Sequence, residues 1–505
     1  MKLKDLIKDV PVRRTVNFNN VEVEGLAYDS RRVRANYLFV AIPGSRQDGH
    51  AYLYDAVARG AKVVVVERKD LVVPSDVVSL LVDNSRLTLA RLASTFFGNP
   101  SRRLKVVGIT GTKGKTTSAY LLHALHQAAG ERCGLISTIS YQIGERAISS
   151  FNTTPESLDL QEMMAEMENS GCQAVVMEVS SHGSAQGRVT GIHFDTAVLT
   201  NVAGHEHLDY HGTFRNYLQA KLKFFEEYLS SSIKEDKLAL VNLDDPSASR
   251  FLKAVAEKNI RVVTWGQKKR ADIKLLSYTL ERTGNHLQIL VEDKVEPFFS
   301  PLRGLGNVFN VLLTVAYGWA RGFPLKVIRT ALSQTAVVPG RFELVEEGQP
   351  FSVVVDYAHT ADSLRSLLTS VRALRPRRII LVFGCGGDRD RSKRPLMGAL
   401  GARLADLVII TSDNPRSENP LRIAEDIRRG IPLFFRRKAV VVIDRRQAIQ
   451  EAIGLADAGD FVVIAGKGHE TYQIFQQTVV PFDDRLEARR ALQSLSQRSG
   501  APGTG

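Results

Sequence analysis

The chain has 505 residues, of which 44% are hydrophobic and 24% are charged, so it can form roughly three globular domains, and no apolar run approaches the ~18 residues of a membrane span. Its net charge of +13 is scattered rather than gathered in one run, which argues against a nucleic-acid partner and fits an anionic small substrate or a solvated surface equally well. Three separated cysteines without a CxxC spacing argue against a disulfide framework or zinc site; with no secretory signal visible, we expect a cytoplasmic protein without stable membrane insertion.

Short Val/Ile-rich runs alternate with helical patterns along the chain, which is typical of parallel sheets with crossover helices. The first set has expected strands at residues 37–44, 62–67 and 77–83, an expected helix at 87–98, and then a linker at "NPS". The second set has a helical pattern near 307–322 and expected strands at 104–110, 133–138, 173–181, 195–202, 238–245 and 261–266.

The third set opens after "VVPGR" and has five expected strands that end in polar or glycine-rich residues, at 351–359, 377–388, 407–415, 439–444 and 460–470. This is a doubly wound pattern, in which ligands bind beyond the carboxyl ends of the strands. The sequence therefore predicts an α/β fold with a small N-terminal α/β domain (1–100), a central domain with a mostly parallel sheet (101–336), a Rossmann-like C-terminal domain (337–492) and a disordered tail (493–505).

A phosphate-binding loop of the P-loop type is predicted in "VVGITGTKGKTTSAYLLHAL", where a buried strand ends at Gly108 and a glycine-rich turn leads into a helix. This order places backbone N–H groups around an anion, with Lys115 on the phosphates and Thr116 able to bind Mg²⁺. Ile109 stands where the strict motif has its first glycine, and a purely structural turn is the alternative. The predicted ATP-binding loop comprises Gly111, Thr112, Lys113, Gly114, Lys115, Thr116 and Thr117.

Acidic and histidine side chains follow the next strand ends. Glu178 in "MEVSSHG" is a natural second Mg²⁺ ligand, and its alternative is a helix cap or an ion pair. Residues 205–211 gather three histidines and two acids, but no second cluster supports zinc, and a structural role for any single histidine is equally expected.

The motifs "GTKGKTT", "NTTP", "EVSSHG", "HLDYHG", "PGRFE", "DYAHTADSL", "GCGGDRDRSKRP", "SDNPRSE" and "GKGHE" occur in this order, and the chain resembles the ATP-dependent Mur ligases over nearly its whole length. The resemblance is to the branch that adds meso-diaminopimelate. It implies an N-terminal domain for the uridine nucleotide, a central ATPase and a C-terminal amino-acid domain. It also implies a monomeric enzyme that joins UDP-N-acetylmuramoyl-L-Ala-D-Glu to meso-diaminopimelate with ATP and Mg²⁺, in peptidoglycan synthesis and hence in cell shape and division.

The resemblance also implies residue roles. The positions that match the site for UDP-N-acetylmuramoyl-dipeptide are Ser30, Ser45, Arg46, Gln47, Asn152, Thr153, Thr154, Ser180, Gln186 and Arg188. Further ATP contacts match Asn307, Asn310, Arg341 and Asp356. His207 matches a Mg²⁺ ligand, and Lys221 matches a lysine that is carbamylated and helps to hold a second Mg²⁺, although the sequence alone does not choose Lys221 over Lys223. The catalytic and metal set is then Lys115, Thr116, Glu178, His207 and Lys221.

Meso-diaminopimelate carries a second carboxylate that lysine lacks, and the paired donors of arginine suit a carboxylate. The positions that match the diaminopimelate pocket are Arg389, Asp413, Asn414, Pro415, Arg416, Gly466 and Glu470. Lysine-adding relatives typically lack the arginine at 416, so this residue favours diaminopimelate. L-lysine or another diamino acid, a folylpolyglutamate-type ligase and a non-catalytic nucleotide-binding scaffold are the alternatives. Ala361 and Glu206 depart from the usual Pro and Asp of the family.

Overall fold

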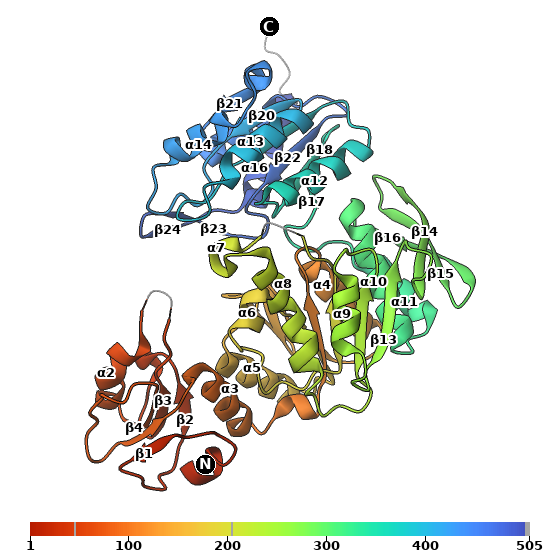
Figure 1. Cartoon of the computed structure of the whole chain (residues 1–505). Helices are drawn as coiled ribbons and strands as arrows, with labels where there is room; N and C mark the ends of the chain where they lie inside the picture. Colours follow the sequence, from red (N-terminus) through yellow and green to blue (C-terminus); the bar gives the residue numbers. More distant parts are fainter. Residues whose placement is uncertain (45–46, 204–205, 500–505) are drawn as a thin grey trace. The chain divides into compact units, whose positions relative to one another are not determined.

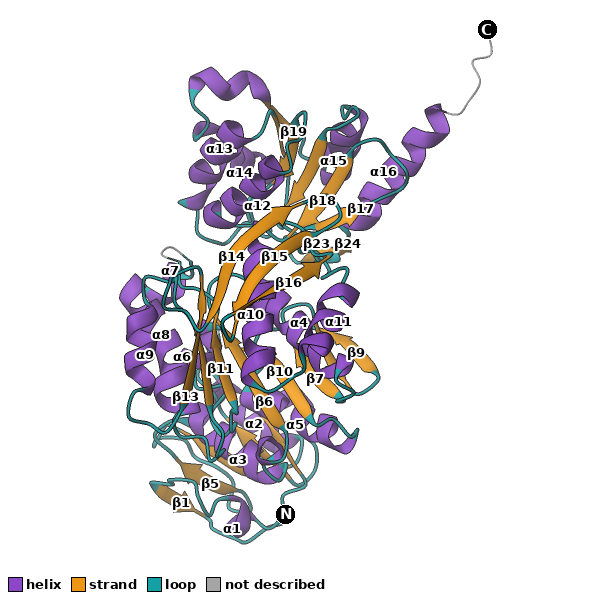
Figure 2. Ribbon diagram, turned by 90° about the vertical axis from the view of Figure 1, so that its right-hand side faces the viewer, coloured by secondary structure: helices purple, strands orange, loops and turns teal. Residues whose placement is uncertain are grey.

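The computed structural model describes residues 1–44, 47–203 and 206–499, and its chain is traced in Figures 1 and 2. Two compact units divide the chain: residues 1–202 with 213–264, and residues 203–212 with 265–505. Each is described by itself. Within the described residues, no helix has the length and apolar character needed to cross a bilayer.

The first unit opens with a five-stranded sheet in the order β1-β5-β4-β3-β2, in which β2 to β5 are parallel and only β1 is antiparallel. The predicted strands and the predicted helix of this region are confirmed, and the side chain of Asn84 caps that helix, α3. The bounds are β1 Arg14–Val16, β2 Gly25–Ala27, β3 Tyr37–Val40, β4 Ala61–Val66, β5 Val78–Leu81, α1 Leu3–Leu6, α2 Leu53–Ala58 and α3 Ser85–Phe96.

The larger sheet of the first unit runs in the order β13-β12-β11-β6-β10-β7-β8-β9. Its six predicted strands are confirmed, whereas the short antiparallel strands β8 and β9 were not predicted. The bounds are β6 Lys105–Thr110, β7 Cys133–Ile136, β8 Ser140–Ile143, β9 Arg146–Ser149, β10 Ala174–Glu178, β11 Thr196–Leu199, β12 Leu238–Asn242 and β13 Arg261–Gly266, with helices α4 Lys115–Ala128, α5 Ser157–Asn169, α6 Ser181–Ala185, α8 Phe214–Lys223 and α9 Ala248–Val255.

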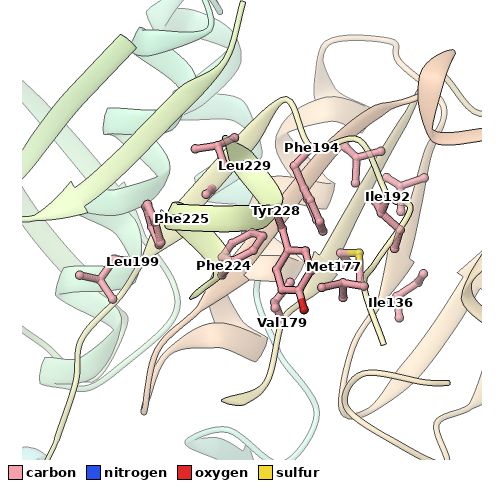
Figure 3. Packing of buried hydrophobic residues seen from close by; sticks show 14 of the residues in the cluster. Ile136, Met177, Val179, Ile192, Phe194, Leu199, Phe224, Phe225, Tyr228 and Leu229 are labelled. Carbon is pink, nitrogen blue, oxygen red and sulfur yellow. The ribbon is translucent and has the colours of Figure 1, made fainter. Parts of the chain in front are cut away.

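The core of this sheet is rich in aromatic side chains. Helix α8 continues into a π-helical turn, η4 (Phe224–Leu229), and Phe224 packs edge-on against Phe194 with ring centroids 4.9 Å apart. Figure 3 shows these rings beside Met177 and Val179 from β10 and its end. Strand β10 is buried on both faces, so Glu178, its last residue, is fully buried.

The second unit begins with short α7 (Leu208–His211) and then a meander of β14 (Ile273–Leu280), β15 (Asn285–Val291) and β16 (Lys294–Ser300). The sequence analysis did not predict these three strands, because none of them is a continuous apolar run: burial alternates along β15, and most residues of β14 and β16 are not buried. Helix α10 (Leu305–Ala320) confirms the predicted helical pattern, and α11 (Leu325–Gln334) follows it.

The C-terminal sheet has the order β17-β18-β22-β19-β20-β21, parallel except for β17. Helices α12, α13 and α14 lie on one face of this sheet and α15 and α16 on the other, as Figure 2 shows, and a separate apolar core fills each face. The predicted doubly wound fold is therefore confirmed. The bounds are β17 Glu343–Val345, β18 Ser352–Asp356, β19 Ile379–Phe383, β20 Leu407–Ile410, β21 Ala439–Val441, β22 Phe461–Ala465, α12 Ala361–Ala373, α13 Lys393–Leu404, α14 Pro420–Arg429, α15 Arg445–Gly454 and α16 Asp484–Ser499, with a hairpin of β23 Tyr472–Phe475 and β24 Thr478–Pro481.

Two boundaries predicted from the sequence were wrong. The tail does not begin at residue 493, because α16 continues to Ser499 and Leu495 packs against the core that already buries Leu492. Strand β6 does not stop at Gly108, because Thr110 still pairs with Leu199 of β11. Residues 500–505 lie outside the described part of the chain.

Candidate active site

The predicted phosphate loop lies between β6 and α4 in the first unit. Gly111 has φ 150° and Gly114 has φ 84°, conformations that residues with a side chain rarely adopt. A Cβ at Gly111 would also collide with the hydroxyl of Thr200. The glycine that this loop requires is thus at 111, which explains why Ile109 is tolerated at the position where the strict motif has glycine.

The end of the neighbouring strand β11 holds the loop in place. Asn201 accepts from the Lys113 backbone N–H through Oδ1 (3.0 Å) and donates to the Lys113 carbonyl through Nδ2 (3.0 Å). Thr200 Oγ1 donates to the same carbonyl at 2.7 Å. These bonds fix the loop backbone before any anion binds, which lowers the entropic cost of binding.

Two lysine side chains meet at one backbone oxygen of the loop. Lys115 Nζ donates to Gly111 O at 2.9 Å and to Thr112 O at 3.1 Å, and Lys221 Nζ from α8 donates to Gly111 O at 2.8 Å. The side chain of Lys221 is buried, whereas that of Lys223 is 28% exposed and lies 3.7 Å from Glu227. The two lysines between which the sequence could not choose thus differ in the structure: Lys221 is buried against the loop, and Lys223 is partly exposed.

Glu178 is buried beside the loop that follows β7. Its Oε1 accepts from the backbone N–H of Thr138 at 2.8 Å and from the Thr138 hydroxyl at 3.1 Å. Its Oε2 is buried and has no hydrogen-bond partner among the described residues. A buried carboxylate oxygen without a partner is costly, and coordination to a cation would satisfy it, so this residue fits a Mg²⁺ ligand.

The predicted peptide-binding residues gather around the same strand end. Thr154 Oγ1 donates to the Glu178 carbonyl and accepts from the Ser180 N–H, both at 2.9 Å. Arg188 donates to the Thr154 carbonyl at 2.8 Å and to Gln186 Oε1 at 2.9 Å. The remaining two join this cluster, since the hydroxyl oxygens of Thr138 and Thr153 lie 3.1 Å apart and Tyr141 OH donates to Asn152 O at 2.5 Å.

The predicted uridine-nucleotide residues are only partly described. Ser30 and Gln47 follow β2 and β3, two neighbouring parallel strands, so they lie beyond the same edge of the N-terminal sheet. Ser45 and Arg46 lie outside the described residues, as does His205.

His207 belongs to the second unit. It is exposed, and its backbone is in the left-handed region with φ 60°. Among the described residues, no group of three or more His, Cys, Asp or Glu side chains is arranged to hold a metal ion. The role of His207 as a ligand stays a prediction.

The second unit holds the other predicted ATP contacts. Asn310 Nδ2 donates to Asn307 Oδ1 at 2.9 Å on α10. At the end of β18, Asp356 accepts from the backbone N–H groups of Phe342 and Ala358, both at 2.8 Å. Desolvation raises the pKa of Asp356, and the nearby guanidinium of Arg341 opposes that rise. The Arg341 guanidinium also stacks over the Tyr357 ring, 4.6 Å from its centroid.

Both family departures lie together near this strand end. Thr360 donates to Glu206 Oε1 at 3.1 Å and forms a capping box with Ser363 at the start of α12. Ala361 is the first residue of that helix, a position that favours proline. The capping box supplies the helix start without proline, which accounts for alanine there.

The turn after β20 carries the predicted amino-acid pocket. Arg416 has φ 52°, and its Nη1 donates to Gly387 O at 2.8 Å. A Cβ at Gly386 would lie 3.0 Å from Arg416 Nη1 and 3.8 Å from Arg389 Cγ. The two predicted arginines thus converge over a glycine of the "GCGGD" loop, where a side chain would crowd them.

Asn414 connects this turn to Glu470 and to a residue that the sequence analysis missed. Its Nδ2 donates to Glu470 Oε2 at 2.9 Å, and its Oδ1 accepts from Lys467 Nζ at 3.2 Å. Lys467 is fully buried and also donates to Glu470 Oε2 at 2.9 Å. Desolvation raises the pKa of Glu470, and Lys467 opposes it. A lysine directly after a buried strand, between two glycines, was the available signal.

Gly466 and Asp413 complete the cluster of predicted residues, because a Cβ at Gly466 would lie 2.8 Å from Asp413 Oδ2. Pro415 is adjacent in the turn, and its carbonyl packs against Gly387. The strand ends of β18, β19, β20 and β22 thus contribute Asp356, the glycine loop, the turn and the 466–470 segment. This agrees with the expectation that ligands bind at the carboxyl edge.

A second missed feature supports the turn from behind. Arg394 at the start of α13 is 1% exposed and donates to both oxygens of Glu418, at 2.8 and 3.0 Å, and to Asp426 at 3.0 Å. Glu418 in turn accepts from the Asp388 N–H at 2.7 Å. The run "DRDRSKR" has too many charges for the sequence to indicate which of them is buried.

Family models match three stretches of the chain: the Mur ligase family catalytic domain at residues 22–97, the Mur ligase middle domain at 109–318, and the Mur ligase glutamate ligase domain at 340–468. Proteins named UDP-N-acetylmuramoyl-L-alanyl-D-glutamate--2,6-diaminopimelate ligase are similar to it. That of Solibacter usitatus is 43% identical over 97% of this chain and 98% of its own length, and that of Geobacillus kaustophilus is 43% identical over 97% and 99%.

Solved structures show the same fold. A structure with that ligase name covers 98% of this chain and 100% of its own, with a TM-score of 0.68 and 30% identity. Mycobacterium tuberculosis folylpolyglutamate synthase, solved with ADP and AMPPCP, covers 81% of this chain and 95% of its own with a TM-score of 0.64, but at 18% identity it is similar in fold alone.

Proposed function

This chain belongs to the Mur ligase family, and on that premise we propose that it is an ATP-dependent amide ligase. It joins meso-2,6-diaminopimelate to the γ-carboxylate of D-Glu in UDP-N-acetylmuramoyl-L-Ala-D-Glu and releases ADP and phosphate, a step of peptidoglycan synthesis. Relatives at 43% identity over nearly the whole chain carry the name of this ligase.

One observation supports the choice of amino acid most directly. The turn at 413–416 presents a guanidinium, Arg416, and through Asn414 it also holds the carboxylate of Glu470. A diamino acid with a distal ammonium and a distal carboxylate offers one partner to each. Lysine has the ammonium alone and would offer no carboxylate to Arg416.

The first step activates the acceptor. A D-Glu carboxylate oxygen attacks the γ-phosphorus of ATP, and the bond from that phosphorus to the β,γ-bridging oxygen breaks. ADP departs, and the D-Glu carboxylate has become an acyl phosphate. Lys115 and the N–H groups of the loop at 111–117 hold the phosphates in line, and Thr154, Ser180 and Arg188 hold the peptide. Mg²⁺, bound by Thr116 and Glu178, supplies charge neutralisation at the phosphates when present.

The second step forms the amide. The neutral amine of diaminopimelate attacks the acyl carbon, phosphate departs with the electrons of the carbon–oxygen bond, and the nitrogen loses one proton. Arg416, with Arg389 beside it, holds the distal carboxylate, and Glu470 holds the distal ammonium. Their positions decide which amine can reach the acyl carbon.

Lys221 is proposed to carry a carbamate. Its amine shares the Gly111 oxygen with Lys115, and two neighbouring ammonium groups repel, which favours the neutral form of one of them. The neutral nitrogen adds to the carbon of CO₂ and releases one proton, giving an anion suited to a second Mg²⁺. His207 remains a proposed ligand of the same metal set.

We further propose a monomeric cytoplasmic enzyme with domains at 1–100 for the uridine nucleotide, 101–336 for ATP and 337–499 for the amino acid. Ser30 and Gln47, with Ser45 and Arg46, are the proposed uridine-nucleotide contacts. Asn307, Asn310, Arg341 and Asp356 are the proposed further contacts to ATP.

ADP release in the presence of the nucleotide dipeptide distinguishes an enzyme from a nucleotide-binding scaffold. We expect sustained ADP formation over many turnovers only when the dipeptide and diaminopimelate are both present, because the acyl phosphate is consumed only by the amine. We also expect Lys115→Ala to abolish turnover while the thermal unfolding midpoint stays near that of the wild type. ADP formation that ignores diaminopimelate, or a Lys115→Ala variant that keeps its turnover, would overturn the proposal. A glutamate-dependent reaction with a folate acceptor would favour the folylpolyglutamate-type alternative.

A further inference from the structure

A single turn on the C-terminal domain exposes two large apolar side chains. In η5 (Leu433–Lys438), Leu433 is 78% exposed and Phe434 is 73% exposed. The next residue, Phe435, packs partly against the core beneath α13 and α14, so the turn is anchored to the domain. η5 leads directly into β21, which Figure 1 labels. None of these residues belongs to the proposed active site.

Cations surround the exposed pair. Residues 427–438 contain five basic residues, of which Arg428 and Arg429 pair with the preceding Glu425 and Asp426, so the cations of the turn itself are Arg436, Arg437 and Lys438. Arg436 and Lys438 each donate to a backbone carbonyl at 3.4 Å, and the guanidinium of Arg437 lies 5.7 Å from the centre of the Phe434 ring. Among the described residues, no carboxylate forms an ion pair with Arg436, Arg437 or Lys438. The charge of this turn is therefore not neutralised by the chain itself.

We propose that η5 docks the enzyme reversibly on an anionic lipid surface, with Leu433 and Phe434 inserted at the headgroup boundary and the cations of 436–438 on lipid phosphates. An exposed Leu-Phe pair beside basic side chains is the pattern of interfacial membrane binding. The inference goes beyond the proposed ligase function and does not depend on it.

Charge and shape favour lipid over a protein partner. The apolar tips of this short turn are exposed by more than two thirds and stand beside three cations, as suits insertion at a charged headgroup layer. Each basic residue near a negatively charged bilayer raises the affinity for it by about fivefold. Burial of the two apolar tips raises the affinity further. The resulting attachment is weak and salt-dependent, as for other proteins without a lipid anchor.

The test is co-sedimentation of the full chain with vesicles of equal parts phosphatidylglycerol and phosphatidylcholine, beside vesicles of phosphatidylcholine alone. We expect binding only to the anionic vesicles and weaker binding as salt rises. The double variant Leu433→Ser, Phe434→Ser should bind at least tenfold more weakly. The triple variant Arg436→Gln, Arg437→Gln, Lys438→Gln should lose on the order of tens-fold or more.

A matched control separates this turn from the overall charge. Lys268→Gln, Lys269→Gln, Arg270→Gln removes the same three charges from another exposed basic triplet and should keep wild-type binding. Equal losses in both triple variants would overturn the proposal, because net charge would then explain the binding. Absence of wild-type binding to the anionic vesicles would also overturn it. So would a concentration-dependent dimer that is lost in the Leu433→Ser, Phe434→Ser variant. A thermal unfolding midpoint near that of the wild type in every variant verifies that the chain is folded.

Discussion

Lys221 and Lys223 stand two positions apart on α8, yet only Lys221 reaches the phosphate loop. The same contrast holds in the amino-acid turn, where Arg416 is fixed by Gly387 O while Arg389 stays exposed beside it. In each pair, two residues of the same type lie close together in the structure, and the backbone directs only one of them toward the candidate site. Substitutions that exchange or remove one member of each pair test the assignments.

Carbamylation should occur at Lys221 and not at Lys223. With ¹³C-labelled bicarbonate, we expect one carbamate carbon signal in the NMR spectrum of the wild type and of Lys223→Ala, and none in Lys221→Ala. The physical reason is the burial of Lys221 beside the ammonium of Lys115, because burial and like-charge repulsion both disfavour a second charged amine. A signal that survives Lys221→Ala would place the modification elsewhere.

Arg416→Lys should lose most of the preference for diaminopimelate over lysine. A lysine ammonium is a point charge and cannot reproduce two parallel N–H donors, so we expect the ratio of kcat/KM values to fall by roughly 10- to 100-fold. Steady-state kinetics with both amino acids give this ratio. Arg391→Lys, an exposed arginine nearby, is the control and should leave the ratio unchanged; an unchanged ratio in Arg416→Lys itself would remove Arg416 from the pocket.

At the scale of elements, α13 supports the amino-acid turn through one buried ion pair. Arg394 joins the start of α13 to Glu418, and Glu418 accepts from the backbone of the loop that bears Arg389. Sequence patterns identified the strands and their carboxyl ends, since these are continuous apolar runs followed by glycine and polar residues. They missed β14 to β16, which are not continuous apolar runs. They could not choose Arg394 from a run of charges or recognise Lys467 as buried, because burial is set by neighbours distant in sequence.

Arg394→Met should destabilise the protein far more than Arg391→Met. Removing Arg394 leaves Glu418 in a mostly buried place without its main partner, at a cost of about 2–3 kcal/mol. Arg391 is 69% exposed although it lies 3.1 Å from the same carboxylate, so its loss should cost less than about 1 kcal/mol. Urea unfolding of the two variants measures both values, and equal losses would contradict the role given to Arg394.

Acid should weaken this support. Hydrogen bonds from Arg394 lower the pKa of Glu418 from an ordinary 4.5 to about 2. A lowered folded-state pKa gives stability that is fully present above pH 4.5 and is lost as the pH falls toward 2. The stability difference between wild type and Glu418→Gln should therefore shrink between pH 4.5 and 2 and stay constant from pH 5 to 8. A difference that does not change in acid would count against the ion pair.

At the scale of the whole molecule, the two compact units carry different chemistry. The first holds the proposed phosphate loop, Glu178 and the proposed peptide-binding cluster, and the second holds the turn with Arg416, together with Glu470. The alternation of apolar runs and helical patterns was enough to predict the α/β fold, and the order of motifs named the candidate residues, whose roles stay predictions. The sequence could not show the limits of α16, because Leu495 extends that helix through a contact with a core assembled from other elements.

The choice of amino acid is the central claim, and kcat/KM measured for meso-diaminopimelate, LL-diaminopimelate, L-lysine and L-ornithine with the nucleotide dipeptide tests it most directly. We predict the highest value for meso-diaminopimelate, exceeding that of L-lysine by at least about 100-fold, because lysine has no carboxylate for the partly buried guanidinium of Arg416. A value for L-lysine equal to or above that for meso-diaminopimelate would contradict the account.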